Sequence, residues 1–195
     1  MKEKFKIGFD IDGVVVDFNT SFLYAARNKF DMLHGVTKDD IVKYNYYECI
    51  DISDKQCWDI VEYVLLNPTE CKTKPIDGSV EVLTKLSTYM DLLFVTARIN
   101  KTIETTKKVL HTFLPDVDKD KIKIIHTRGS KKHEVLKKFG INYFVDDRLK
   151  TYHILKQNNI NPILFTHPWN KTEEELVRVK DWSELYNLIS KKRIN

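Results

Sequence analysis

Short apolar stretches alternate along the chain with longer segments in which apolar residues recur at helical spacing. The apolar stretches predict β-strands, because each is too short for a helix and is bounded by turn-forming residues. The predicted strands cover about residues 4–10, 91–95, 122–125, 142–146 and 163–165. The predicted helices between and after them cover residues 79–89, 101–114, 131–139 and 182–189.

One segment breaks this alternation. Between the first two strands, helical patterns run over roughly residues 18–66 without a strand. Within it, Ser53 and Gln56 form a capping-box pattern before an apolar helix face that starts at Trp58. Residues 74–78 carry proline and glycine and predict a linker that leads back to the alternating part.

Alternating strands and helices predict a parallel sheet with helices on both faces. We therefore expect an α/β protein with a Rossmann-like, doubly wound parallel sheet. Residues 1–16 and 76–195 would form this core. Residues 17–75 would form a small helical cap, inserted after the first strand and standing over the carboxyl edge of the sheet.

Two acids follow the first predicted strand. Side chains alternate along a strand, so Asp10 and Asp12 point the same way, and Gly13 lets the chain turn sharply after them. Paired carboxylates repel each other, so such a site favours a cation or a shared proton. Taken alone, the run is equally compatible with a turn whose acids are simply hydrated.

Polar residues also end two later strands. Thr96 and Arg98 follow the second strand, and Asp146-Asp147 closes the fourth. Lys132 lies in the first turn of the helix before that fourth strand, after Ser130 as the expected N-cap. Ligands of open parallel sheets bind beyond the carboxyl ends of the strands, so these side chains are expected to gather at one edge.

The order Asp-x-Asp, Thr, Lys, Asp-Asp resembles that of the haloacid dehalogenase superfamily of phosphotransferases, over residues 10–147. The resemblance implies that Asp10 is a nucleophile that forms an aspartyl-phosphate. Asp12 would protonate the leaving oxygen and later activate water. It also implies Mg²⁺, held by carboxylate oxygens of Asp10 and Asp146 and by the backbone carbonyl of Asp12. Asp147 would bind through water or orient a ligand.

Three residues are candidates for binding phosphate. Thr96 offers a hydroxyl and a backbone N–H, although a threonine at a strand end can also be satisfied by backbone groups. The family spacing places the phosphate-binding lysine at Lys132 rather than Lys131. Arg98 either holds the substrate phosphate in a bidentate pair or forms an ion pair at the surface.

The phrase Asp-x-Asp-Gly-Val-Val-x-Asp, with Thr-Ala-Arg after the second strand, resembles the 5'(3')-deoxyribonucleotidase branch, as does the run Pro168-Trp169-Asn170. This implies hydrolysis of (deoxy)ribonucleoside monophosphates. Tyr44, Tyr46 and Tyr47 either stack a base or pack inside the cap. The run at 168–170 is either a functional loop or a turn whose tryptophan packs on the core.

Other functions share some of these residues. A phosphatase for sugar phosphates or for polynucleotide 3'-phosphate ends would use the same motifs, and a non-catalytic phospho-ligand binding protein would keep them. A dehalogenase has no use for Asp12 or for a metal. A phospho-receiver domain places its acid pair first and its phospho-accepting aspartate in mid-chain, which is a different order.

Composition narrows the setting. A net charge of +4, from 32 basic and 28 acidic residues, suits a small phosphorylated metabolite and does not call for nucleic acid. The absence of a long apolar stretch or signal-peptide pattern predicts a cytoplasmic protein without membrane contact. The three cysteines lack C-x-x-C spacing, which predicts free thiols. Nothing in the sequence indicates a protein partner or an oligomeric state.

Overall fold

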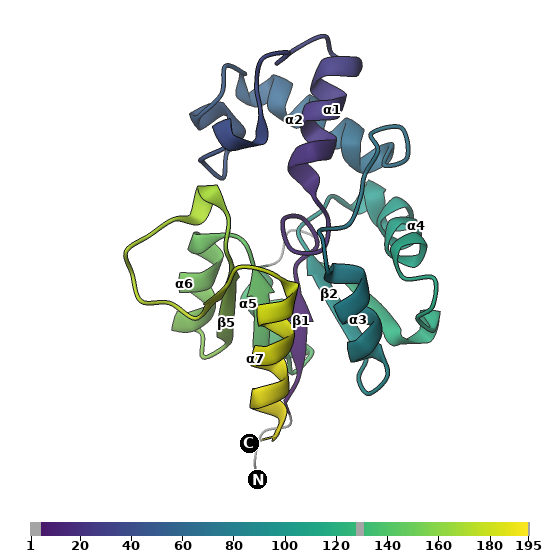
Figure 1. Ribbon diagram of the computed structural model, residues 1–195, viewed down its shortest axis with the longest axis vertical. Coiled ribbons are helices and arrows are strands. Elements are labelled where there is room, and N and C mark those ends of the chain that lie inside the picture. Colours follow the sequence, from purple (N-terminus) through teal and green to yellow (C-terminus); the bar gives the residue numbers. More distant parts are fainter. Residues whose placement is uncertain (1–4, 128–130, 195) are drawn as a thin grey trace.

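The structure, a computed structural model, describes residues 5–127 and 131–194. These residues form a six-stranded parallel sheet with the strand order β3-β2-β1-β4-β5-β6 (Figure 1). The strands are β1 (Ile7–Phe9), β2 (Leu92–Thr96), β3 (Ile122–His126), β4 (Tyr143–Asp146), β5 (Asn161–Phe165) and β6 (Arg178–Val179). The predicted Rossmann-like, doubly wound parallel sheet is confirmed.

Helices cover both faces of this sheet. One face carries α3 (Ser79–Ser87), α4 (Ile103–Phe113) and α7 (Trp182–Ile194), and the other carries α5 (Lys132–Lys138) and α6 (Leu149–Gln157). Figure 1 shows α3 and α7 in front of the sheet, with the C-terminal end of α7 on the side away from α1 and α2. Short 3₁₀ turns cover Lys38–Asp40, Tyr46–Glu48, Asn100–Thr102, Lys119–Lys121 and Pro168–Asn170.

The centre of the sheet is fully buried, which explains the unbroken apolar runs of its strands. Trp182 of α7 packs against Phe9 of β1 and Phe165 of β5, with ring centroids 5.6 and 6.2 Å apart. Its indole Nε1–H donates to the Val14 carbonyl oxygen at 2.9 Å. The core therefore fixes the loop that follows β1, where the two N-terminal acids lie.

Residues between β1 and α3 build a second helical layer, which lies beyond one end of the sheet in Figure 1. It contains α1 (Phe18–Asn28) and α2 (Asp54–Leu66). The chain leaves and returns side by side, because Asp17 N–H donates to Lys74 O at 3.0 Å and Ile76 N–H donates to Val15 O at 2.8 Å. This layer has its own apolar cluster, which we call the cap cluster. Its buried members are Phe22, Leu23, Ala25, Ala26, Ile41, Ile50, Ile52, Cys57, Ile60, Val64 and Cys71.

Several local predictions are confirmed. The capping box at the start of α2 is formed, because Ser53 Oγ accepts from Gln56 N–H and the Gln56 side chain bonds the Ser53 backbone. Gly140 has a φ of 64°, the left-handed conformation expected after α5. All three cysteines are free thiols. In the described part of the chain, no helix is long and apolar enough to cross a membrane.

Other features differ from the sequence prediction. The helix α6 and the strand β6 were not predicted, because α6 buries only Tyr152 and Leu155 and β6 is held by pairing at the sheet edge rather than by an apolar run. Trp58 was placed on the buried face of α2 but is 60% exposed. The expected N-cap Ser130 lies outside the described residues.

Candidate active site

The site begins in the loop after β1. Asp10 lies directly beyond this strand, and its backbone N–H donates to the Val145 carbonyl oxygen at 2.9 Å. Gly13 follows with a φ of +75°, and a Cβ atom there would lie only 2.3 Å from Asp147 Oδ2. A glycine is therefore required twice, by the left-handed turn and by the close approach of this carboxylate.

Three buried carboxylates meet at the carboxyl edge of the sheet. Asp10, Asp146 and Asp147 each offer an oxygen, and these oxygens all lie within 4.8 Å of one another. Because β1 and β4 are adjacent and parallel, with Phe9 opposite Val145, the residues that follow them are brought side by side. Such a concentration of hard oxygen donors suits a divalent cation.

Lys132 supplies positive charge to this cluster. Its Nζ lies 2.7 Å from Asp146 Oδ2 and 3.2 Å from Asp10 Oδ2. Asp146 is held further by the Arg148 backbone N–H, which donates to its Oδ1 at 2.9 Å. Lys131 is exposed and immediately precedes α5. The structure therefore places Lys132, and not Lys131, against the acids.

Burial and crowding shift the ionisation of these groups. Burial raises the pKa of Asp10 to about 7; the ammonium of Lys132 opposes this shift, while Asp146 and Asp12 add to it. Burial, Asp146 and Asp10 together raise the pKa of Asp147 well above its ordinary value. Burial alone would lower the pKa of Lys132, but Asp10 and Asp146 raise it above the ordinary value. Burial and mutual repulsion therefore disfavour the ionised forms of Asp10 and Asp147 when no cation is bound.

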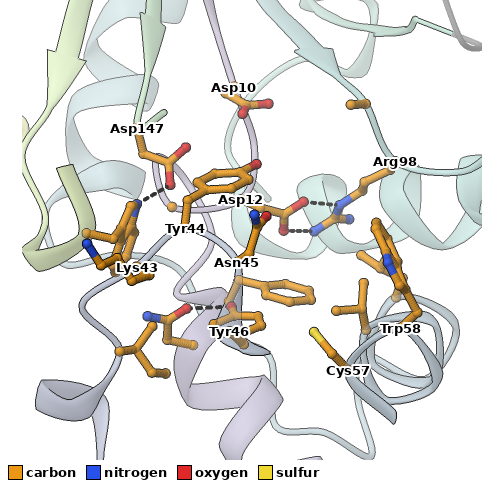
Figure 2. Close-up of a pocket in the computed structure, with 18 of the residues that line it drawn as sticks. Asp10, Asp12, Lys43, Tyr44, Asn45, Tyr46, Cys57, Trp58, Arg98 and Asp147 are labelled. Atoms are coloured by element: carbon orange, nitrogen blue, oxygen red, sulfur yellow. Dashed lines mark hydrogen bonds and ion pairs between the residues drawn. The ribbon is translucent and has the colours of Figure 1, made fainter. Parts of the chain in front are cut away.

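Asp12 is held by Arg98 rather than by the cluster. Arg98 Nε donates to Asp12 Oδ2 at 2.8 Å and Nη2 donates to Oδ1 at 2.6 Å, which makes a bidentate pair (Figure 2). Arg98 Nη1 donates to Thr106 Oγ1 at 3.2 Å. The ion pair considered for Arg98 is therefore formed, with Asp12 as its partner, but it is not at the surface, because Arg98 is only 8% exposed. Its binding of phosphate stays a prediction.

Thr96 ends β2 beside this pair. It is buried, and its Oγ1 accepts a hydrogen bond from the Arg98 backbone N–H at 3.1 Å. A backbone group therefore satisfies the acceptor side of the Thr96 hydroxyl, as one of the two alternatives for this residue expects. Because the hydroxyl accepts from Arg98, its own hydrogen can still be donated to a ligand.

The loop after β5 closes the site from another side. Trp169 Nε1–H donates to Asp147 Oδ2 at 3.0 Å, and Asn170 Nδ2 donates to the Asp147 carbonyl oxygen at 2.7 Å. His167 Nε2 lies 2.6 Å from the Gly13 carbonyl oxygen. A carbonyl only accepts, so Nε2 carries the hydrogen, and burial lowers the pKa of His167 in keeping with a neutral ring.

A cavity of about 300 Å³ opens above these groups, between the cap layer and the sheet edge. Figure 2 shows Asp10, Asp12, Arg98 and Asp147 facing it from the core side. Its other lining residues are Gly13, Phe18, Asn19, Ile41, Lys43, Tyr44, Asn45, Tyr46, Tyr47, Cys57, Trp58, Val61, Leu65, Thr96, Ala97, Ile99 and Trp169. A cavity of this size lies at the lower end of the range for small-molecule sites.

The aromatic residues of the cap layer serve different ends. Tyr46 stacks on Phe22 with centroids 4.1 Å apart and donates its hydroxyl to Asn19 Oδ1 at 2.6 Å, so it is part of the cap interior as well as the cavity wall. Tyr44 and Tyr47 are 45% and 42% exposed at the cavity. Of the two alternatives that the sequence leaves open for these tyrosines, packing inside the cap is observed for Tyr46, and stacking on a base stays a prediction.

The structure thus brings the predicted residues into one region. Asp10, Asp12, Thr96, Arg98 and Asp147 line the cavity, and Lys132 and Asp146 lie directly behind Asp10. The cavity lining also includes Lys43, Asn45, Trp58 and Ile99, which the sequence pattern does not indicate as site residues. For Trp58 the signal was its size next to Cys57, which takes the buried position instead. The other three carry no local pattern that sets them apart.

The chain is similar to a family of nucleotidases over most of its length. Over residues 4–194, the chain matches the model of the family described as 5' nucleotidase, deoxy (pyrimidine), cytosolic type C protein. A relative from Oceanobacillus iheyensis, named "Putative nucleotidase", is 23% identical over 191 residues, which cover 92% of this chain and 96% of the relative. One from Halalkalibacterium halodurans with the same name is 25% identical over 190 residues, which cover 94% and 92%.

Solved structures show the same fold. A "predicted phosphatase" from Clostridium acetobutylicum superposes with a TM-score of 0.64 at 18% identity, covering 96% of this chain and 100% of that protein. A haloacid-dehalogenase-type hydrolase from Bacillus subtilis, solved with bound magnesium, gives a TM-score of 0.62 at 12% identity, covering 96% and 100%. These hydrolases therefore share the fold of this chain, in which the candidate site lies at the carboxyl ends of the parallel strands.

Proposed function

Starting from the family to which the chain belongs, the cytosolic type C 5'-nucleotidases of the haloacid dehalogenase superfamily, we propose a specific activity for this phosphatase. It is a Mg²⁺-dependent phosphomonoesterase that hydrolyses (deoxy)ribonucleoside monophosphates through an aspartyl-phosphate. The observation that carries the proposal is the meeting of Asp10, Asp146, Asp147 and Lys132 at the floor of a cavity walled by aromatic side chains.

The donor set fits Mg²⁺. Three buried carboxylates face one lysine, so the described cluster carries more negative than positive charge when it is ionised. Asp10 and Asp146 would hold the cation through carboxylate oxygens and Asp12 through its backbone carbonyl, with Asp147 beside them. When bound, Mg²⁺ supplies charge neutralisation of the phosphoryl oxygens. The magnesium in the similar Bacillus subtilis hydrolase supports this choice.

Asp10 and Asp12 divide the chemistry. Asp10 Oδ forms a bond to phosphorus while the phosphorus–oxygen bond to the nucleoside breaks, and Asp12 gives its proton to the leaving oxygen. Water then attacks phosphorus and Asp12 takes its proton. The bond from Asp10 to phosphorus breaks, which releases phosphate and restores the carboxylate.

Arg98 sets the orientation of Asp12. The bidentate pair aims the carboxylate, whose side chain is 31% exposed, into the cavity. The two hydrogen bonds hold both carboxylate oxygens of Asp12 in place, and the ionised carboxylate is the form that takes a proton from water. In the first step, the proton on Asp12 competes with Arg98 for the same oxygens. Arg98 therefore acts on phosphate transfer through Asp12, with its remaining N–H groups available to a phosphoryl oxygen.

Residues 17–75 act as the substrate-selecting cap. This layer touches the core beside the cavity, where Thr105 Oγ1 donates to the Leu65 carbonyl oxygen at 2.9 Å and Lys101 pairs with Glu62 at 2.5 Å. The Arg148 guanidinium lies 4.3 Å from the centre of the Tyr44 ring, next to Asp146. These contacts hold the aromatic wall over the phosphoryl site, where a nucleobase would be received.

A phosphate-release screen tests the proposed function. We expect Mg²⁺-dependent release from nucleoside 5'- or 3'-monophosphates that stops with a chelator and returns with added Mg²⁺. Faster release from sugar phosphates or from 3'-phosphorylated oligonucleotides would replace the proposed substrate with one of these alternatives. Binding of nucleotides without any release would show a binding protein.

The cap's role in selection gives a second expectation. Replacing Tyr44 and Tyr47 together by alanine should lower kcat/KM for a nucleoside monophosphate about 10-fold, since stacking on one base is worth about 1–3 kcal/mol. Turnover of a small aryl phosphate should fall less, because remote binding energy is lost while the phosphoryl site stays intact. Tyr24→Ala, at a cap tyrosine outside the cavity lining, is the control. Equal losses on both substrates would assign these tyrosines to packing alone.

A further inference from the structure

Trp169 touches both the cap layer and the acid cluster. Its ring is partly buried against the cap cluster, although the residue itself belongs to the core loop after β5. Its Nε1–H donates to Asp147 Oδ2 at 3.0 Å, the bond drawn to Asp147 in Figure 2. One side chain thus joins the apolar interior of the cap to a carboxylate of the proposed metal site.

Trp169 is itself held firmly. The His167 ring stacks on its indole, with centroids 4.0 Å apart and planes inclined by 8°. His167 in turn donates to the Gly13 carbonyl oxygen in the loop that carries Asp12. Asn170 donates through Nδ2 to the carbonyl oxygens of Asp147 and Phe165, each at 2.7 Å. The position of the indole N–H is therefore fixed both by the loop after β5 and by the cap cluster.

The kind of donor matters for the cluster. Asp10 and Asp146 face the charged Lys132, which neutralises part of their charge. Asp147 receives a neutral N–H instead, which orients its carboxyl group without adding a positive charge that would compete with a cation. A carboxylate oriented in this way, among oxygens within 4.8 Å of one another, meets a cation without first having to reorganise.

From this geometry we infer that Trp169 is a positioning residue that orients Asp147 for the metal and couples metal binding to closure of the cap. The inference rests on the proposed Mg²⁺ site. Coupling of this kind is reciprocal: if the closed cap holds the indole against Asp147, bound Mg²⁺ stabilises the closed cap by the same free energy.

Calorimetric titration with Mg²⁺, without substrate, tests the positioning role. Trp169→Phe keeps a ring for the His167 stack and removes the N–H donor, and Trp58→Phe makes the same exchange elsewhere on the cavity wall. We expect Mg²⁺ affinity to fall about 10-fold in Trp169→Phe, the scale found for lost partners of metal ligands, and to stay within about two-fold in Trp58→Phe. An unchanged affinity in folded Trp169→Phe overturns the inference. A wild-type protein that binds no Mg²⁺ overturns the proposed metal instead.

Two further measurements cover a misfolded variant and the link to the cap. In the wild-type protein, the indole N–H resonance of Trp169 should shift during the Mg²⁺ titration with the calorimetric midpoint, and that of Trp58 should not. A Trp169 resonance that ignores Mg²⁺ overturns the inference. Mg²⁺ should also slow amide hydrogen exchange in α1 and α2 of the wild-type protein. Unchanged exchange there overturns the coupling to the cap.

Discussion

The Asp10→Asn variant is expected to lose phosphatase activity by a factor on the order of 10⁴ or more, the scale seen when a catalytic nucleophile is removed. An amide is a poor nucleophile and a weaker ligand for a hard cation than a carboxylate. Initial rates of phosphate release at saturating Mg²⁺ measure the loss. Asp51→Asn, at an exposed acid of the cap layer, is the matched control. Near-normal Mg²⁺-dependent hydrolysis by Asp10→Asn would remove Asp10 from the chemistry.

Thermal unfolding of the Asp10→Asn variant distinguishes a loss of phosphatase activity from a loss of the folded state. Burial raises the pKa of Asp10 in the metal-free folded protein to about 7, against 3.8 for the ordinary side chain. The folded state then binds more protons than the unfolded state between these values, so this group's contribution to stability is lost as pH rises through about 7. Asparagine does not titrate. Metal-free Asp10→Asn should therefore gain stability relative to wild type as pH rises from about 4 to 8, as thermal unfolding can show.

The position of the acids could be predicted because it depends on topology alone. Asp10, Thr96 and Asp146 each end or follow a strand of a parallel sheet, and all such ends meet at one edge. The strands could be predicted from the sequence because their apolar runs are buried on both faces of the sheet. The prediction of the acid cluster needed no side-chain contacts, because it follows directly from the prediction of a parallel sheet.

Pairings between distant side chains could not be predicted in the same way. Arg98 and Asp12 are 86 residues apart, and only the folded geometry shows that the guanidinium engages this carboxylate. The run containing Trp169 stood out, but its hydrogen bond to Asp147 depends on how the loop after β5 folds back. The apolar pattern predicted a buried Trp58, but this residue lines the cavity, because a cavity wall needs apolar side chains just as a core does.

Lys132 provides the last expectation, because two adjacent lysines offer a built-in comparison. Lys132 is the first residue of α5, where a cation opposes the helix dipole. It is nevertheless drawn inward, with its side chain 16% exposed between Asp10 and Asp146. A position that breaks a local rule in this way often serves a functional site. Phosphate bound to Asp10 would lie within reach of this ammonium.

We therefore expect Lys132→Ala to lower kcat/KM about 10- to 100-fold, since a hydrogen bond to a charged group is worth about 1.5–3 kcal/mol. Lys131→Ala should change it little, because Lys131 is exposed. Removing Lys132 leaves Asp10 and Asp146 uncompensated, so the metal-free variant should unfold at a lower temperature and recover with Mg²⁺. Lys132→Gln, which keeps most of the side chain, serves if the alanine variant does not fold. The reverse ranking of the two lysines would place the phosphate-binding residue one position earlier, at Lys131.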